Sequence, residues 1–314
     1  MTTRQRLREL LGLDRLEPAT PAHLEGAEPA GTEPPAPQEV GLQLADGTSI
    51  PCFLLRPTPQ KDNGMGAVLI AGHGRGIDSL VETGESEEFN TGTAYAFVDA
   101  GFTVLCPEVL SFGRRRFPRP EGAPPYEPTE NSCGVDATRH MMRGIPLMGR
   151  RVADAAAAVD ALGGLPGMDP QRVVIAGGSG GGAVSLLLAA VEPKVAAALV
   201  ASYFCTFEAS LCSIRHCPCN IIPGILPEME MADIASLIAP RPLVLEASER
   251  DHIFPIAATR ASFERLPPVW EASDAPVPEL VVTGGGHAFR AERSLEALVQ
   301  QLAGETGRTR PGGP

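Results

Sequence analysis

The chain lacks a hydrophobic run of the roughly 18 to 20 residues that a membrane-spanning helix needs. It also lacks an apolar segment behind the basic residues Arg4 to Arg8, so we expect no secretory signal peptide. Positive charge is scarce, because 26 Lys and Arg face 38 Asp and Glu and leave a net charge of -12. Such a field repels phosphate backbones. We therefore expect neither nucleic acid nor membrane as a partner, and a cytoplasmic protein.

A complete disulfide framework is missing as well, because seven cysteines are an odd number in a long chain. Most of them are expected to be reduced thiols. One short segment gathers Cys205, Cys212, His216, Cys217 and Cys219. A C-x-C beside a C-x₄-C is not a usual spacing for structural zinc. We therefore expect a core or pocket-lining role for this group and no metal.

What is present is the composition of a folded protein, with 43% hydrophobic and 20% charged residues in 314. Residues 1–37 combine an amphipathic helix over residues 4–13 with a proline-rich stretch that suits an extended strap. A catalytic domain is expected over residues 38–303, and residues 304–314 read as a flexible tail. The sequence contains no internal repeat.

Strand and helix patterns alternate through the central range. A hairpin turning at Asp46-Gly47 comes first. The strands are expected at 40–44, 49–55, 67–71, 103–106, 172–176, 195–201, 243–246 and 280–283, and the helices at 86–100, 149–162, 180–191, 229–238, 257–266 and 291–302. Apolar strands joined by crossover helices predict an α/β fold with a mostly parallel sheet covered on both faces. Residues 107–147 show little periodicity, and a loop of this length predicts a lid-like insertion.

The strongest motif is the segment Val173 to Gly182, in which a buried strand enters G-x-S-x-G and a helix follows. This is the context of a nucleophile elbow centred on Ser179. Glycine is needed at Gly177 and Gly181 because side chains there would collide with the strand and helix. The segment lacks the Lys-Ser/Thr of a P-loop and the dinucleotide-binding context of G-x-G-x-x-G. Ser179 is therefore the expected nucleophile.

A serine hydroxyl needs a base, and in elbow-bearing folds the chain order is Ser, Asp or Glu, then His. His287 follows the last expected strand on a glycine-rich loop, whereas His216 and His252 lack that placement. We therefore predict His287 as the base. Asp251, just beyond a strand, is the predicted acid that orients the imidazole. The rivals for the acid are Glu246, Glu249 and Asp274.

An oxyanion hole needs backbone N–H groups that face the developing charge. We expect one from Gly180 and one from Arg75, in the turn after the first central strand, where His73 would support the loop. The Arg75 side chain either holds an anionic substrate or is solvated. The dense basic run Arg114 to Arg119 is either a solvated surface or a means of steering an anionic substrate.

Several separated blocks together resemble the α/β-hydrolases, and within them the dienelactone-hydrolase and acetyl-xylan-esterase-like branch. The blocks are Gly72 to Gly76, Ser111 to Arg115, Gly177 to Gly181, Arg215 to Gly224, Ile238 to Leu243 and Asp251 to Pro255. The resemblance spans roughly residues 65–300 and leaves the N-terminal extension outside. It implies a serine esterase for small acyl esters or lactones, without metal or cofactor. Some dienelactone hydrolases carry cysteine at the elbow, whereas this chain carries Ser179.

The sequence thus predicts a serine carboxylic-ester hydrolase with Ser179, His287 and Asp251 as its triad. A serine peptidase or an acyltransferase on the same fold is a second interpretation, and a binding protein without turnover is a third. A small ester or lactone is the expected partner. The oligomeric state stays open, with a homo-oligomer among the options.

Overall fold

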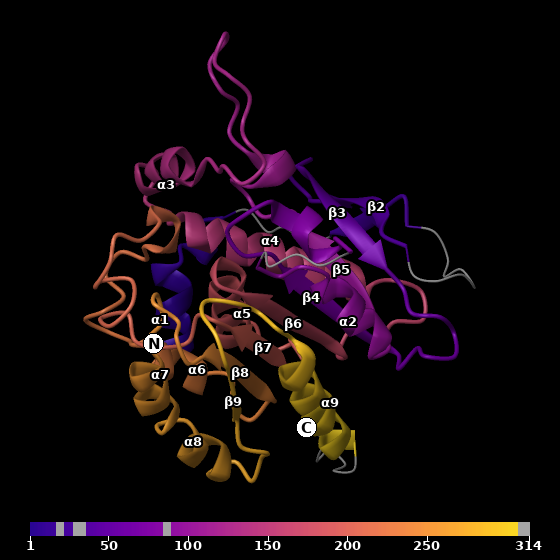
Figure 1. Ribbon diagram of the computed structural model, residues 1–314, viewed down its shortest axis with the longest axis vertical. Coiled ribbons are helices and arrows are strands. Elements are labelled where there is room, and N and C mark those ends of the chain that lie inside the picture. The colour runs from indigo at the N-terminus through magenta and orange to yellow at the C-terminus, as the bar shows by residue number, and fades with distance from the viewer. Residues whose placement is uncertain (17–21, 28–35, 84–88, 307–314) are drawn as a thin grey trace.

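The structure, a computed structural model, describes residues 1–16, 22–27, 36–83 and 89–306 (Figure 1). These residues form a nine-stranded sheet in the order β1-β2-β3-β5-β4-β6-β7-β8-β9. The strands are β1 (His23–Glu25), β2 (Gln38–Gln43), β3 (Ser49–Leu55), β4 (Met65–Ile70), β5 (Phe102–Pro107), β6 (Val173–Gly178), β7 (Ala198–Ala201), β8 (Leu243–Ser248) and β9 (Glu279–Thr283). Pairing is antiparallel from β1 to β3 and between β3 and β5, and parallel from β5 across to β9. The predicted mostly parallel sheet is confirmed.

Helices cover both faces of this sheet (Figure 1). They are α1 (Thr3–Leu10), α2 (Thr93–Asp99), α3 (Cys133–Met141), α4 (Leu147–Gly163), α5 (Gly180–Val191), α6 (Met231–Ser236), α7 (Ile256–Phe263), α8 (Pro267–Glu271) and α9 (Glu292–Thr306), with 3₁₀ turns η1 (Leu13–Arg15), η2 (Gly76–Leu80), η3 (Gly113–Arg115) and η4 (Pro218–Asn220). In the central strand β4, Ala67 and Leu69 pack with α2 and α9, whereas Val68 and Ile70 pack with α4 and α5. This alternation is what a strand buried on both faces requires. In the described part of the chain, no helix is both long and apolar enough to cross a bilayer.

The N-terminal helix belongs to the core of the described structure. Leu7 and Leu11 are fully buried, in the same apolar cluster as α4 and α5. Arg4 donates hydrogen bonds to carbonyl oxygens on the far side of the contact, those of Ala190 and Leu237, at 2.8 and 2.6 Å. The helix therefore packs on the α4–α5 face of the sheet.

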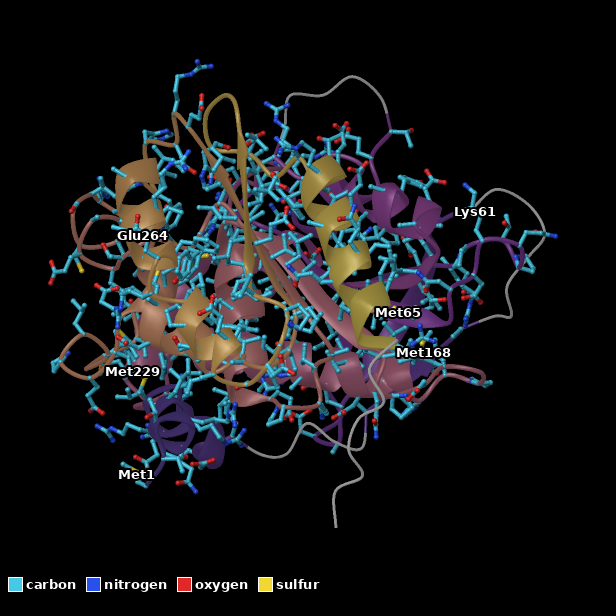
Figure 2. The ribbon with its side chains drawn as sticks, turned by 90° about the horizontal axis from the view of Figure 1, so that it is seen from below. Met1, Lys61, Met65, Met168, Met229 and Glu264 are labelled. Carbon is cyan, nitrogen blue, oxygen red and sulfur yellow. The ribbon has the colours of Figure 1, made fainter. Side chains whose placement is uncertain are left out.

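Segments that are far apart in the sequence meet beside α1. Met1 and Met229 lie at one corner (Figure 2), where Arg6 pairs with Glu228. Part of the predicted strap forms β1, which extends the sheet at β2. The rest of that strap, residues 17–21 and 28–35, lies outside the described residues, as do residues 307–314 of the predicted tail.

The predicted insertion lies between β5 and α4 and contains η3 and α3. Between η3 and α3 the chain rises from the body as a narrow loop (Figure 1). The buried carboxylate of Glu108 accepts hydrogen bonds from the amides of Ile77 and Arg114, both at 3.2 Å. This carboxylate ties the insertion to the turn after β4. Whether the insertion acts as a lid stays a prediction.

Besides the 3₁₀ turns, one strand and two α-helices differ from the sequence-based expectation, namely β1, α3 and α8. β1 is only three residues long and sits in the proline-rich strap. α3 begins Cys133-Gly134, and its hydrophobic spacing is too short to stand out within the irregular insertion. The expected helix over residues 86–100 begins at Thr93, after Gly92 in the left-handed region, and residues 84–88 lie outside the described residues.

Candidate active site

Ser179 lies at the junction of β6 and α5 with a backbone φ of 54°. This left-handed conformation is strained for a residue with a side chain. The glycines on either side of Ser179 allow the backbone to adopt this conformation. A Cβ at Gly181 would lie 2.0 Å from the carbonyl oxygen of Ile70, and a Cβ at Gly177 would lie 2.7 Å from that same oxygen. The close approach of β4, β6 and α5 therefore fixes the sharp turn that presents Ser179.

The N-terminus of α5 lies directly beside the serine hydroxyl. The Ser179 amide donates to Ala201 at 2.9 Å, and the first hydrogen bond of the helix runs from Ala183 to the Ser179 carbonyl. The amides of the first helical residues, Gly180 among them, precede the intrahelical ladder. Such amides and the helix dipole favour negative charge. The backbone here is suited to stabilise an oxyanion.

The structure brings His287 and Asp251 together. His287 Nδ1 lies 2.8 Å from Asp251 Oδ2. The other oxygen of this carboxylate accepts the amides of Ile253 and Phe254, at 2.8 and 3.1 Å. Burial raises the pKa of Asp251, but the hydrogen bonds from His287 and these two amides outweigh it, so the pKa lies below its ordinary value. The carboxylate is thus held ionised and aimed at one ring nitrogen.

The rival acids lie elsewhere. Glu246, on β8, accepts the amides of Arg290 and Ala291 at 2.6 and 3.2 Å, and the hydroxyl of Ser294. It therefore anchors the start of α9 and does not contact the imidazole. Glu249 and Asp274 are both exposed. Asp251 is the carboxylate that the described structure pairs with His287.

The other two downstream histidines are placed differently. His252 is exposed. His216 is half-buried and contacts the ring of Phe254 edge-on, with ring centroids 6.3 Å apart. Burial lowers the pKa of His216. Among the described residues, neither imidazole forms a hydrogen bond or ion pair with the Asp251 carboxylate.

The segment that carries His287 lies against the elbow. Phe289 Cβ would be 2.9 Å from a Cβ at Gly178, the residue before Ser179. The Ser202 hydroxyl, at the end of β7, donates to the Ala288 carbonyl at 2.5 Å. Within the described residues, Ser179 Oγ and His287 Nε2 make no hydrogen bond. Catalytic hydrogen bonds often tighten only when substrate is bound.

Two phenylalanines that the sequence analysis did not single out contact the imidazole. Phe89 and Phe254 stack on His287, with centroid separations of 4.9 and 5.8 Å and interplanar angles of 20° and 24°. They fix the plane of the ring and shield it from water. Phe89 lies in no motif, and the block Asp251 to Pro255 assigns Phe254 no role, so only the folded arrangement identifies these two contacts.

The turn after β4 reaches the elbow as well, because β4 and β6 are parallel neighbours whose carboxyl ends meet. A Cβ at Gly72 would lie 2.9 Å from the Gly178 carbonyl oxygen. Arg75 is the N-cap of η2 beside this turn, and its guanidinium pairs with Glu82 at 2.6 Å. The Arg75 side chain therefore has an acidic partner within the protein.

The basic run of the insertion is paired in the same way. Arg114 contacts Asp78 at 2.9 Å, and Arg115 contacts Asp154 at 2.8 Å. Arg116 and Arg119 both lie over the ring of Tyr126. These contacts build the insertion, so the arginines have structural partners.

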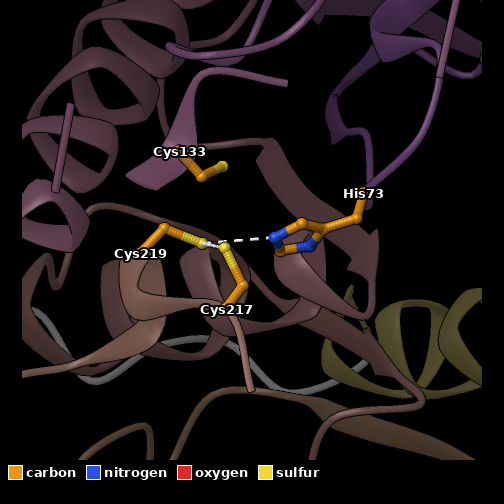
Figure 3. A group of neighbouring side chains, drawn as sticks. All are labelled: His73, Cys133, Cys217 and Cys219. Carbon is orange, nitrogen blue, oxygen red and sulfur yellow. Dashed lines mark hydrogen bonds between the residues drawn. The ribbon is translucent and has the colours of Figure 1, made fainter. Parts of the chain in front are cut away.

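A second group of reactive side chains lies next to the elbow and was not expected from the sequence. His73, Cys133, Cys217 and Cys219 place their ligand atoms within 4.8 Å of one another (Figure 3). His73 belongs to the turn after β4, and a Cβ at Gly180 would lie 2.8 Å from its Nδ1. Cys205, Cys212 and His216 are outside this group.

The model of the alpha/beta hydrolase family matches residues 67–306, so the chain belongs to that family. A comparison with curated proteins finds no match. The family predicted from the sequence motifs is confirmed.

Solved structures similar to the chain include several esterases. A glucuronoyl esterase from Solibacter usitatus is 15% identical with a TM-score of 0.58, over 95% of this chain and 91% of that one. Acetyl xylan esterase 1 from Thermoanaerobacterium sp. is 17% identical with a TM-score of 0.56, over 96% and 92%. A Klebsiella pneumoniae protein, named as a candidate dienelactone hydrolase, is 18% identical with a TM-score of 0.54, over 88% and 100%. At these identities the similarity shows a shared fold.

Proposed function

We propose that the protein is a serine carboxylic-ester hydrolase that works through an acyl-enzyme. The observation that carries the proposal is the His287–Asp251 pair at 2.8 Å, in which His287 lies on a loop that packs against the strained elbow of Ser179. This chemistry requires a nucleophile, a base and an acid that orients the base. Here the three residues follow the ends of three strands.

In the proposed reaction, Ser179 Oγ attacks the ester carbonyl carbon while His287 Nε2 takes the hydroxyl proton. The negative charge on the carbonyl oxygen is stabilised by the amides of Gly180 and Arg75. His287 then gives its proton to the departing alcohol, and an acyl-Ser179 ester remains. A water molecule, deprotonated by His287, attacks that ester and releases the acid. Asp251 keeps the imidazole in the required tautomer and stabilises the imidazolium.

The proposed substrates are small acyl esters or lactones. The esterase names among the similar structures support this class. The excess of acidic residues supports a small-molecule partner over nucleic acid or a membrane surface. The odd number of cysteines in a long chain, which we interpret as mostly reduced thiols, supports a cytoplasmic location.

The decisive experiment replaces the nucleophile. Ser179→Ala should lower turnover of a short-chain nitrophenyl ester by at least about 10³-fold, since the covalent step is lost. It should also abolish labelling by a fluorophosphonate probe. Ser273→Ala, the same change at an exposed position, is the matched control and should behave as the wild-type chain. Circular dichroism checks that both variants are folded.

Wild-type turnover by Ser179→Ala would remove this residue from the mechanism. A folded wild-type chain that neither turns over esters nor reacts with the probe would indicate a binding role. A panel of acetyl, longer acyl, uronate methyl and lactone esters then defines the substrate. Amide or transesterified products in the presence of amines or alcohols would indicate an acyltransferase.

A further inference from the structure

We infer that His73, Cys133, Cys217 and Cys219 form a structural zinc site beside the oxyanion loop, by which we mean the turn after β4 that carries His73 and the proposed Arg75 amide. The donor set is three thiols and one imidazole, all within 4.8 Å of one another (Figure 3). Three cysteines and one histidine are among the usual ligand sets of structural zinc. The site does not depend on the proposed hydrolysis.

The spacing of the four donors fits a tetrahedral ion. Zinc–sulfur bonds of about 2.3 Å place sulfurs about 3.8 Å apart around a tetrahedral centre. Here Cys219 Sγ lies 3.1 Å from Cys217 Sγ and 3.2 Å from His73 Nε2. The observed spacings, from 3.1 to 4.8 Å, bracket the tetrahedral value.

A buried cation beside the thiols is the second observation. Arg151 is 3% exposed, and its Nη2 lies 3.2 Å from Cys133 Sγ. Its other partners are the Cys219 thiol, the Leu110 carbonyl and the ring of Phe112. Among the described residues no carboxylate pairs with it. A buried charge needs a counter-charge, and a zinc ion with three thiolates and a neutral imidazole carries a net charge of -1. The pair is then neutral.

One further polar contact supports the same group. The Asn220 amide donates to Cys219 Sγ at 3.3 Å. Donors of this kind commonly surround metal-bound thiolates and orient them. On binding, the three thiol protons leave to solvent and His73 coordinates through Nε2 with its proton on Nδ1.

The position of the site suggests its role. His73 comes from the oxyanion loop, Cys133 opens α3 of the insertion, Cys217 is the N-cap of η4 and Cys219 lies within η4. Zinc would join these three segments next to Gly180. Since all four positions are protein ligands, the ion has no open position for substrate and is structural. It holds the oxyanion loop and the insertion in place.

The first test measures metal in the full-length wild-type chain by mass spectrometry of the elements, after purification without chelators. We expect about one zinc per chain. Cobalt substituted for it should give the visible bands of tetrahedral thiolate coordination. A wild-type chain that takes up neither metal would overturn the site. So would a Cys217–Cys219 disulfide detected in the chain purified without reductant.

The second test uses matched variants. Cys133→Ser and Cys217→Ser should weaken zinc binding by at least about tenfold. The control is Cys212→Ser, an exposed thiol in the same segment as Cys217, and it should bind as the wild-type chain does. Wild-type affinity in Cys133→Ser, or equal loss in Cys212→Ser, would contradict the inference.

If a variant does not fold, alkylation of the wild-type chain tests the site instead. Zinc should protect the half-buried Cys217 from alkylation, and its removal should restore the reaction, while the exposed Cys212 reacts in both states. Equal reactivity of Cys217 with and without zinc would also overturn the site. Ser179→Ala should bind zinc normally, so failure of the metal site and failure of the esterase proposal are told apart.

Discussion

Two groups of side chains flank the N-terminus of α5, and they are assembled in opposite ways. Asp251 and His287 each follow the carboxyl end of a parallel strand, β8 and β9, so the sheet itself brings them together. The cluster of three thiols and the His73 imidazole instead comes from loops and the insertion, and His73 and Cys219 are separated by 146 residues. The first group follows from the fold class, whereas the second follows from how this particular chain connects its strands.

If these groups are chemically independent, each can be changed without the other. The largest effect is expected from Asp251→Asn, which keeps the shape of the acid but favours the wrong imidazole tautomer. Turnover number should fall by about 10⁴-fold, while zinc content stays at the wild-type level. Steady-state ester hydrolysis and metal analysis of the same sample provide both readouts.

The control for this change is Glu249→Gln, which neutralises a neighbouring exposed acid and should leave turnover unchanged. A loss of zinc in Asp251→Asn would show that the two groups are coupled. Wild-type turnover in that variant would assign the acid role to another carboxylate.

An intermediate effect is expected on the other side of the comparison. Arg151→Met removes the buried cation next to Cys133 and should weaken zinc binding by about 10- to 100-fold, because the anionic site loses its counter-charge. Arg151→Lys keeps the charge and should lose less. Competition with a chromophoric chelator measures both affinities. Equal losses in the two variants would mean that Arg151 acts through packing alone.

The smallest effect concerns pH. The pKa of Asp251 is lower in the folded chain than its ordinary value of 3.8, so the folded state is stabilised by the ionised form. That stabilisation is complete above the ordinary value and is lost as the pH falls through the folded one. The wild-type advantage in unfolding free energy over Asp251→Asn should therefore shrink between about pH 5 and about pH 3. Urea unfolding at several pH values measures it, and a constant difference would contradict the assignment.

The sheet, most of its helices and the elbow could be predicted because their signals are local. The segment Val173 to Gly182 carries strand, turn and helix in ten consecutive positions. The motif itself predicts that only glycine fits at Gly181, and in the structure a Cβ added there would lie 2.0 Å from the Ile70 carbonyl oxygen. Family chain order narrowed the acid and base to a few candidates.

The cluster of His73, Cys133, Cys217 and Cys219 could not be predicted, because the spacing of cysteines within one segment carries no information on ligands from distant segments. Cys217 and Cys219 were grouped with Cys205 and Cys212, their neighbours in sequence, and the expectation of no metal rested on that grouping. Phe89 and Phe254 escaped notice for the same reason, since aromatic residues on loops show no periodicity. Such contacts depend on loop conformation.

The burial of Leu7 and Leu11 has a practical consequence for anyone handling the protein. Proteolytic nicking or truncation within the first sixteen residues would uncover the apolar underside of α5, the helix whose opposite end begins beside Ser179. Chains shortened at this end should therefore aggregate although they still contain all their active-site residues. Fusion partners are better attached at the other terminus.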